Sequence, residues 1–278
     1  MTQASRNAAY DNSAAVADSA EIIQSWIEAS TVFRSQRSKH IDLAYGPRER
    51  NKWDLFPGSN PQAPCLVLIH GGYWQSRNRE TFSCFAEGLS THGWSIALPG
   101  YTLAPAATLA QIVQEMRCAL DWLAAQGQVH GINGPIIVSG WSAGGHLSAL
   151  TLDHPSVVAG LAISGIFELG PIRDTHLNER LKLSDEEVDT LSPLRLPSVS
   201  KPMAIAYGTA ELTALVHNSR EYHAHRAQSH HPGFLIPVPN ANHYSIMEGL
   251  RSPNGILTRT VMTLIQDVAL RSAVSKRD

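Results

Sequence analysis

The sequence predicts an α/β fold with a mostly parallel central sheet, helices on both faces of that sheet and a small lid-like insertion. Short apolar runs alternate with longer stretches of helical periodicity along most of the chain. Several apolar runs are continuous, as at Cys65–Ile69, which is typical of strands buried on both faces of a parallel sheet. The chain has 278 residues, of which 43% are hydrophobic, so we expect one large domain, residues 1–278, with a sizeable core.

Charge and composition argue against several classes of function. The net charge is −2 and 17% of the residues are charged, so neither nucleic acid nor a membrane surface is an expected partner. The three cysteines fit no metal-binding spacing, and their odd number argues against a disulfide framework. The chain has no apolar run of about 18 residues and no secretory signal, so we expect a cytoplasmic protein. A small molecule is the expected substrate, and a homodimer is left open.

The first third of the chain leads into the sheet. Residues 1–17 are rich in Ala, Ser and Asn, and we expect them to be loosely ordered. Apolar residues at helical spacing predict an amphipathic helix over residues 18–37. Two strand-like runs follow, at 40–45 and 52–56, and the turn residues at 46–51 join them into an antiparallel N-terminal hairpin.

The rest of the chain alternates between strands and helices. Strands are predicted at 65–69, 94–98, 136–138, 157–163, 203–207 and 233–238, and helices at 79–92, 108–126, 212–228 and 254–270. A further helix follows the strand at 136–138. Residues 165–200 interrupt the alternation with charged residues and prolines, and we expect them to form the lid-like insertion of short helices over the sheet edge.

The sequence G-W-S-A-G at 140–144 lies between an apolar strand and a helical pattern. Strand, sharp turn and helix are the context of a nucleophile elbow, in which the serine oxygen projects from a strained turn. Gly140 and Gly144 leave room for the close approach of backbone that this turn needs. The pattern therefore predicts Ser142 as a catalytic nucleophile.

A serine nucleophile needs a base within hydrogen-bond reach and a third group to orient that base. His243 comes directly after the strand at 233–238, where the base of such an enzyme is expected. Glu211 and Glu221 are the only acidic residues between Asp189 and His243. Glu211 follows the strand at 203–207, whereas Glu221 lies well inside the next helix, so we expect Glu211 to be the orienting acid.

The oxyanion hole is expected to combine two backbone segments. The residue after the nucleophile, Ala143, supplies one N–H, and the loop after an early strand supplies the other. That loop reads His70-Gly71-Gly72-Tyr73-Trp74, with Gly72 and Tyr73 as the expected donors.

Four aromatic residues are predicted to line the substrate pocket, because each lies in a loop beside this site. Ordinary core packing is the alternative for all four. They are Tyr73, Trp74, Tyr101 and Trp141.

One helix also carries a possible metal-ligand set. His217, Glu221 and His225 are spaced four residues apart, which places them on one helix face. A solvated helix face is the preferred interpretation, because serine chemistry needs no metal. We therefore expect neither a metal nor a cofactor.

With these motifs, the chain resembles the α/β-hydrolase superfamily, more narrowly its H-G-G branch and, within it, the kynurenine formamidase (arylformamidase) group. The resemblance extends over about residues 40 to 270 and rests on the sequences H-G-G-Y-W-Q at 70–75, Y-T-L-A-P at 101–105, G-W-S-A-G-G-H-L at 140–147, S-G-I-F-E-L at 164–169 and H-Y-S-I-M-E at 243–248. It implies the α/β-hydrolase fold and hydrolysis of N-formyl-kynurenine to kynurenine and formate, a step of tryptophan catabolism, by a serine triad. One departure is that the group usually has aspartate where Glu211 stands.

Three alternative functions use the same motifs. The first is a carboxylesterase for short-chain acyl esters, and the second is an amidase or lactamase, which differs only in the shape of its pocket. The third is a non-catalytic ligand-binding protein on a hydrolase scaffold, although such proteins typically lose the serine or the histidine.

Overall fold

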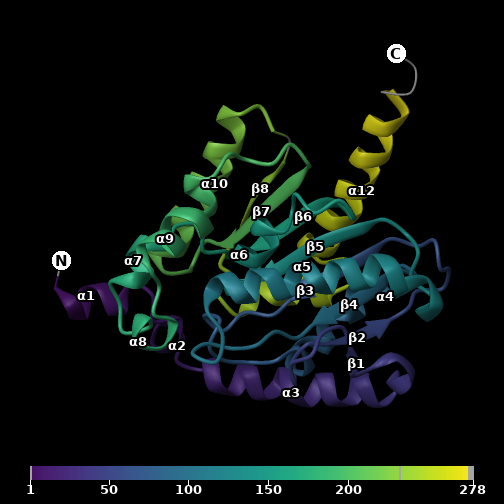
Figure 1. Cartoon of the computed structure of the whole chain (residues 1–278), viewed down its shortest axis with the longest axis horizontal. Helices are drawn as coiled ribbons and strands as arrows, with labels where there is room; N and C mark the ends of the chain where they lie inside the picture. Colours follow the sequence, from purple (N-terminus) through teal and green to yellow (C-terminus); the bar gives the residue numbers. More distant parts are fainter. Residues whose placement is uncertain (1, 232, 275–278) are drawn as a thin grey trace.

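The computed structural model describes the backbone of residues 2–231 and 233–274 (Figure 1), and the side chains of residues 2–231 and 233–271. The described part of the chain contains one sheet with the strand order β1-β2-β4-β3-β5-β6-β7-β8. The strands are β1 (Leu43–Ala44), β2 (Lys52–Phe56), β3 (Cys65–Ile69), β4 (Ser95–Pro99), β5 (Ile136–Trp141), β6 (Val157–Ile163), β7 (Met203–Gly208) and β8 (Leu235–Val238).

The sheet is mostly parallel, as predicted. Strands β1 and β2 pair antiparallel as the N-terminal hairpin, and β2 pairs antiparallel with β4. From β4 to β8 every neighbouring pair is parallel. The predicted α/β-hydrolase architecture is therefore confirmed, with the hairpin at one edge and β8 at the other.

The register of the central strands brings three loops together. At the C-terminal end of β5, Gly140 pairs with Ile69 of β3, and Trp141 pairs with Ile163 of β6. The residues that follow these three strands therefore meet at one edge of the sheet. In parallel α/β sheets this edge is where ligands bind.

Helices cover both faces of the sheet. They are α1 (Gln3–Ala8), α2 (Asn12–Ala15), α3 (Ser19–Ser35), α4 (Glu87–Ser90), α5 (Leu109–Gln126), α6 (Ala143–Leu150), α7 (Gly170–Arg173), α8 (Asn178–Leu181), α9 (Asp185–Leu191), α10 (Thr213–Gln228), α11 (Glu248–Arg251) and α12 (Ile256–Val274). Short 3-10 helices occupy η1 (Ser38–His40), η2 (Arg79–Ala86), η3 (Gly127–His130), η4 (Pro193–Arg195) and η5 (Ser245–Met247).

Two hydrophobic cores lie on opposite sides of the sheet. Along β3, Val67 belongs to the core that includes Met116 of α5. The next residue, Leu68, belongs to the core that includes Phe85 of η2 and Leu257 of α12. Successive strand side chains point to opposite faces, so the continuous apolar run in β3 serves both cores.

The N-terminal segment differs from the prediction. Residues 1–17 are expected from composition to be loosely ordered, but α1 and α2 form there and pack against the insertion, beside α7 and α8 (Figure 1). Gln3 Nε2 donates to the carbonyl oxygen of Asp174 at 2.8 Å, and Asn7 Oδ1 accepts from the N–H of His176 at 3.0 Å. Composition contains no information on such partners, which lie about 170 residues away in sequence.

One predicted helix takes a different form, whereas the insertion consists of short helices, as expected. The helix expected over residues 79–92 begins as the 3-10 helix η2 and becomes α-helical only in α4. The insertion over 165–200 consists of α7, α8, α9 and η4. Short helices such as η5 and α11 are not predicted, because segments of three or four residues carry no measurable periodicity.

Candidate active site

Ser142 lies in a strained turn between β5 and α6. Its backbone has φ 57° and ψ −118°, outside the regions that a residue with a side chain usually adopts. A Cβ on Gly140 would lie 2.1 Å from the carbonyl oxygen of Gly144, and a Cβ on Gly144 would lie 2.0 Å from that of Ile69. Only glycine fits at either position. The N–H of Ser142 donates to the carbonyl oxygen of Ile163 at 2.8 Å and ties the turn to β6.

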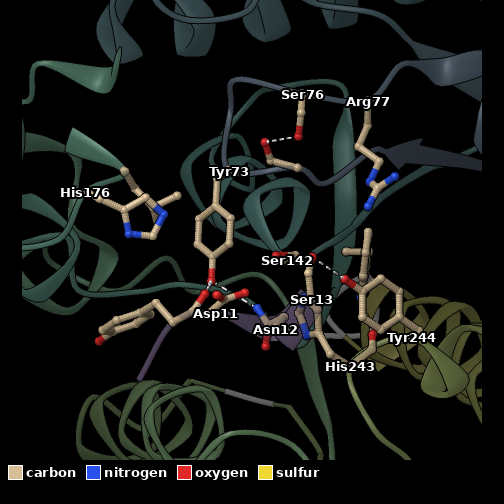
Figure 2. Close-up of a pocket in the computed structure, with 14 residues that line it drawn as sticks. Asp11, Asn12, Ser13, Tyr73, Ser76, Arg77, Ser142, His176, His243 and Tyr244 are labelled. Carbon is tan, nitrogen blue, oxygen red and sulfur yellow. Dashed lines mark hydrogen bonds between the residues drawn. The ribbon is translucent and has the colours of Figure 1, made fainter. Parts of the chain in front are cut away.

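His243 and Glu211 form a buried pair. His243 Nδ1 lies 3.1 Å from Glu211 Oε2, and their side chains are 4% and 0% exposed. The indole N–H of Trp141 donates to the carbonyl oxygen of His243 at 2.7 Å, and the two rings lie 4.7 Å apart. These contacts fix the position of the imidazole, and His243 lines the same pocket as Ser142 (Figure 2).

The second oxygen of Glu211 is held by two donors. Glu211 Oε1 accepts from Ser164 Oγ and from the N–H of Gly208, both at 2.6 Å. Ser164 follows β6 directly and has φ 51°, so a strained backbone places its hydroxyl. Sequence reasoning did not identify this role, although the polar residue directly after the apolar strand at 157–163 was a usable signal.

The glycine loop runs close against the elbow. Gly72, Tyr73 and Trp74 have φ values of 110°, 50° and 58°. A Cβ on Gly71 would lie 3.1 Å from Ser142 Cβ, so this loop passes directly beside the serine. Among the described residues, the N–H groups of Gly72, Tyr73 and Ala143 make no hydrogen bond. The segments predicted to form the oxyanion hole therefore carry unused donors beside Ser142.

His70 is the first residue of this loop, and its side chain is buried. Its ring stacks on Tyr101 at 4.2 Å, and its Nδ1 lies 2.8 Å from the carbonyl oxygen of Gly71. Tyr101 donates its hydroxyl to the carbonyl oxygen of His70 at 3.0 Å. Burial lowers the pKa of His70 to about 3, so the ring is neutral near neutral pH. The neutral ring of His70 therefore anchors the start of the loop through its contacts with Tyr101 and Gly71.

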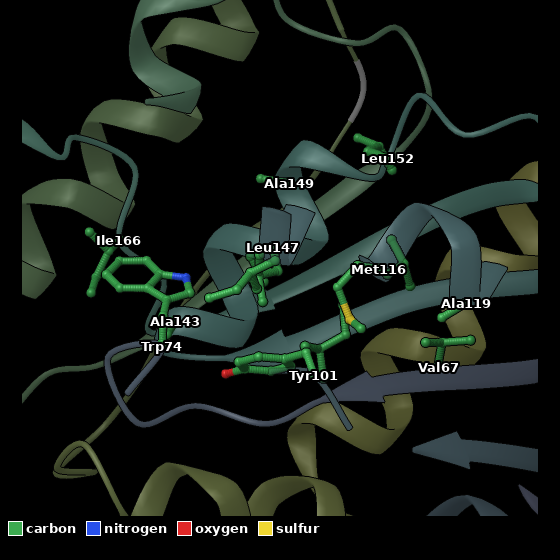
Figure 3. Close-up of a cluster of buried hydrophobic side chains, with 14 of the residues drawn as sticks. Val67, Trp74, Tyr101, Met116, Ala119, Ala143, Leu147, Ala149, Leu152 and Ile166 are labelled. Carbon is green, nitrogen blue, oxygen red and sulfur yellow. The ribbon is translucent and has the colours of Figure 1, made fainter. Parts of the chain in front are cut away.

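The pocket has a volume of about 190 Å³ and a polar lining. Two of the four predicted aromatic residues, Tyr73 and Trp141, line it. The prediction was wrong for Trp74 and Tyr101, which are fully buried in the core beneath the loop (Figure 3). Trp74 and Tyr101 are instead ordinary core residues, which was the alternative to a place in the pocket.

Most of the pocket wall was missed by sequence reasoning. It comes from the N-terminal segment, the residues just after the glycine loop, the insertion and the residue after His243, namely Tyr10, Asp11, Asn12, Ser13, Ser76, Arg77, His176, Leu177 and Tyr244. Apart from Tyr244, which lies in the H-Y-S-I-M-E sequence at 243–248, these residues carry no motif.

The three residues of the possible metal-ligand set on α10 do not share one partner. Two of them pair with each other, and the third contacts a different segment. His217 Nε2 lies 3.0 Å from Glu221 Oε1, and both side chains are exposed. His225 Nε2 lies 2.9 Å from the carbonyl oxygen of Leu196. Within the described residues, no three His, Cys, Asp or Glu side chains gather into a possible metal site. In the same part of the chain, no helix combines the length and hydropathy needed to span a bilayer.

Comparison with known proteins identifies the families that this chain resembles. The family model described as BD-FAE matches residues 55–154. A kynurenine formamidase of Danio rerio is 28% identical over 248 residues, which cover 84% of each chain. The crystal structure of a putative thioesterase from Silicibacter sp. TM1040 is 27% identical, has a TM-score of 0.84, and covers 92% of this chain and 98% of its own.

A further structural neighbour is more distant in sequence. Esterase B from Lactobacillus rhamnosis has a TM-score of 0.72 at 16% identity, over 95% of this chain and 100% of its own, and shares the fold. The chain is therefore a hydrolase with the α/β-hydrolase fold, similar to kynurenine formamidases and to esterases.

Proposed function

We propose that this chain removes a small acyl group from an aromatic amide, and that its substrate is N-formyl-kynurenine, which it cleaves to kynurenine and formate. The observation that carries the proposal is that His243, paired with the buried Glu211, lines the same pocket as the strained Ser142. The similarity to a kynurenine formamidase over most of both chains supports the choice of substrate.

The proposed reaction has two steps. Ser142 Oγ attacks the formyl carbon while Nε2 of His243 takes the hydroxyl proton, and Glu211 stabilises the imidazolium that forms. The unused N–H groups of Gly72, Tyr73 and Ala143 stabilise the oxyanion. His243 then gives its proton to the departing amine nitrogen as the C–N bond breaks. A water molecule, activated in the same way by His243, releases formate and restores Ser142.

The walls of the pocket favour a polar leaving group. Arg77 and His176 line it together with Asp11, so groups able to carry either sign of charge surround the space beside Ser142. His176 belongs to the insertion over residues 165–200, which we propose contacts the leaving-group part of the substrate.

A purified-enzyme assay tests the substrate. N-formyl-kynurenine is compared with p-nitrophenyl acetate and p-nitrophenyl butyrate. We expect turnover of the formamide to match or exceed that of the esters. Good turnover of both esters with none of the formamide would overturn the formamidase proposal and leave a carboxylesterase, the second candidate, which the esterase structural neighbours favour.

Labelling tests the nucleophile. A fluorophosphonate probe reacts with activated serines, so we expect it to label the wild-type chain and not the Ser142→Ala variant. Absence of label on a folded wild-type chain would point instead to a non-catalytic binding protein.

A further inference from the structure

Two side chains of opposite charge line the pocket that holds Ser142 and His243. They are Arg77, just after the glycine loop, and Asp11, on the N-terminal segment (Figure 2). Among the described residues no ion pair includes either of them. His176, on the insertion, also lines the pocket but is exposed to solvent. A wall that keeps two opposite charges unpaired is complementary to a ligand that carries both.

Arg77 is held close to the reacting end of the pocket. A Cβ on Gly72 would lie 2.7 Å from Arg77 Cγ, and a Cβ on Gly71 would lie 3.1 Å from Ser142 Cβ. Because adjacent Cα atoms are about 3.8 Å apart, Arg77 Cγ lies within about 13 Å of Ser142 Cβ. The backbone of Arg77 has φ 72°, and its carbonyl oxygen accepts from Arg50 Nη2 at 2.7 Å, so the residue is fixed in position.

The guanidinium group of Arg77 is half-buried and has donors to spare. It points toward Tyr244 (Figure 2), whose neutral hydroxyl can accept from only part of its five N–H groups. Within the described chain no nitrogen of Arg77 is a buried atom without a partner, so those that do not face Tyr244 are accessible. Burial lowers the pKa of this guanidinium, which is the direction expected of a cation without an anion beside it.

Asp11 uses only one of its carboxylate oxygens within the described part of the chain. Oδ1 accepts from the N–H of Ala14 at 3.0 Å and caps α2. Oδ2 accepts no hydrogen bond there and is not a buried atom without a partner, so it is accessible. The residues on either side hold Asp11 in place, because the Tyr73 hydroxyl donates to the carbonyl oxygen of Tyr10 at 2.6 Å and accepts from Asn12 Nδ2 at 3.0 Å.

We infer that this wall binds the zwitterionic head group of an α-amino acid on the leaving amine, with Arg77 binding its carboxylate and Asp11 Oδ2 its ammonium group. This inference rests on the proposed function and deepens it. A guanidinium matches a carboxylate through paired N–H···O bonds, and a carboxylate oxygen accepts from an ammonium group. In N-formyl-kynurenine seven bonds separate the formyl carbon from the carboxylate carbon, which spans at most about 9 Å. That span is within the distance allowed between Ser142 and Arg77.

Two substrates with the same formamide end test the carboxylate contact. The desamino analogue of N-formyl-kynurenine keeps the carboxylate, and o-formamidobutyrophenone has neither charge. In Arg77→Gln, kcat/KM for the acid is expected to fall at least about tenfold further than kcat/KM for the neutral ketone, because only the acid loses an ion pair. Equal changes for the two substrates would overturn the role of Arg77.

Two further variants support that measurement. Arg77→Lys keeps the charge but not the fork of N–H groups, so a smaller loss, again selective for the acid, is expected even if Arg77→Gln does not fold. Arg220→Gln is the matched control. Arg220 is exposed on α10 and lies outside this pocket, so removing its charge should leave the ratio of the two substrates within about twofold of the wild-type value.

The ammonium contact is tested by comparing N-formyl-kynurenine with its desamino analogue. Asp11→Asn keeps an acceptor that can cap α2 but removes the charge. We expect kcat/KM for N-formyl-kynurenine to fall at least about fivefold further than kcat/KM for the desamino analogue. An equal loss for both substrates would overturn the role of Asp11.

Failure of the proposed function has a separate signature. If the wild-type chain cleaves no formamide, desamino-kynurenine and o-aminobutyrophenone are measured as inhibitors of p-nitrophenyl acetate hydrolysis. The inference then requires that Arg77→Gln weaken inhibition by the acid at least about tenfold more than inhibition by the neutral ketone. An unchanged ratio of the two inhibition constants would overturn it, whereas a selective change would overturn only the proposed reaction.

Discussion

Glu211 uses its two carboxylate oxygens for different partners. Oε2 faces His243, whereas Oε1 is held by Ser164 and by the backbone of Gly208. The carboxylate is therefore fixed before any substrate binds, and the histidine ring is oriented by a rigid acceptor. The longer side chain of glutamate reaches the same partner that aspartate usually serves in the group that this sequence resembles.

Replacing Glu211 by glutamine tests this arrangement. The amide keeps the size of the side chain, but it stabilises an imidazolium poorly and can favour the wrong tautomer of His243. We expect Glu211→Gln to lower kcat/KM for p-nitrophenyl acetate by about 10³-fold to 10⁴-fold.

Glu221→Gln provides the control for that measurement. Glu221 is the other acid that the sequence leaves eligible, and it lies on the exposed face of α10, paired with His217. Its replacement should leave kcat/KM within about twofold of the wild-type value. A larger effect at Glu221 than at Glu211 would contradict the assignment of the acid.

Among the secondary-structure elements, the sequence is most informative for buried strands. The boundaries of β3 and β6 agree with the prediction, because both are continuous apolar runs whose ends are marked by proline or polar residues. The 3-10 helix η2 and the helices α1 and α2 are not recovered, because tertiary contacts rather than local periodicity hold them. Prediction therefore succeeds where a strand is a continuous apolar run whose ends are marked in the local sequence.

The turn between β5 and α6 allows a stability prediction. In Gly144→Ala, the new methyl group would lie 2.0 Å from the backbone oxygen of Ile69, which cannot move without disturbing β3. We expect the free energy of unfolding to fall by about 2–3 kcal/mol, measured by urea denaturation.

Gly249→Ala is the matched glycine replacement. A Cβ there would lie 3.2 Å from Leu257 Cγ and 3.3 Å from Ile256 Cγ2, with no backbone atom so close, and Gly249 lies inside α11, where alanine is the better helix former. Its free energy of unfolding should stay within about 1 kcal/mol of the wild-type value. Similar losses for both variants would argue against a specific steric limit at the elbow.

In the whole molecule, the candidate site combines segments that a sequence motif predicts with segments that no motif predicts. The glycine loop, the elbow, Glu211 and His243 each follow a strand, so strand order and motifs together locate them. The wall formed by the N-terminal segment and the insertion carries no motif. It was missed because its position depends on contacts such as Gln3 with Asp174. The candidate catalytic residues could therefore be predicted from the sequence, whereas most residues of the pocket wall could not.

Two buried histidines link the stability of the molecule to pH. His70 is the first residue of the glycine loop, and His146 of α6 has its Nε2 2.7 Å from the carbonyl oxygen of Leu191. Burial lowers the pKa of His70 to about 3 and the pKa of His146 to about 4, against 6.5 for the unfolded chain. The unfolded state therefore binds protons in a range of pH where both folded side chains stay neutral.

The sign of the effect follows from this difference. Well above pH 6.5 neither state protonates these groups, so their contribution to stability is fully present. As the pH falls from about 6.5 toward 4, each histidine reduces the free energy of unfolding by up to about 1.4 kcal/mol per pH unit.

Replacing His146 by phenylalanine removes one such group. The slope of the unfolding free energy between about pH 5.5 and 4.5 should then fall by about 1 kcal/mol per pH unit, even if the variant is less stable at pH 7. Urea denaturation at a series of pH values measures the slope. A slope equal to that of the wild-type chain would show that His146 is protonated in the folded protein.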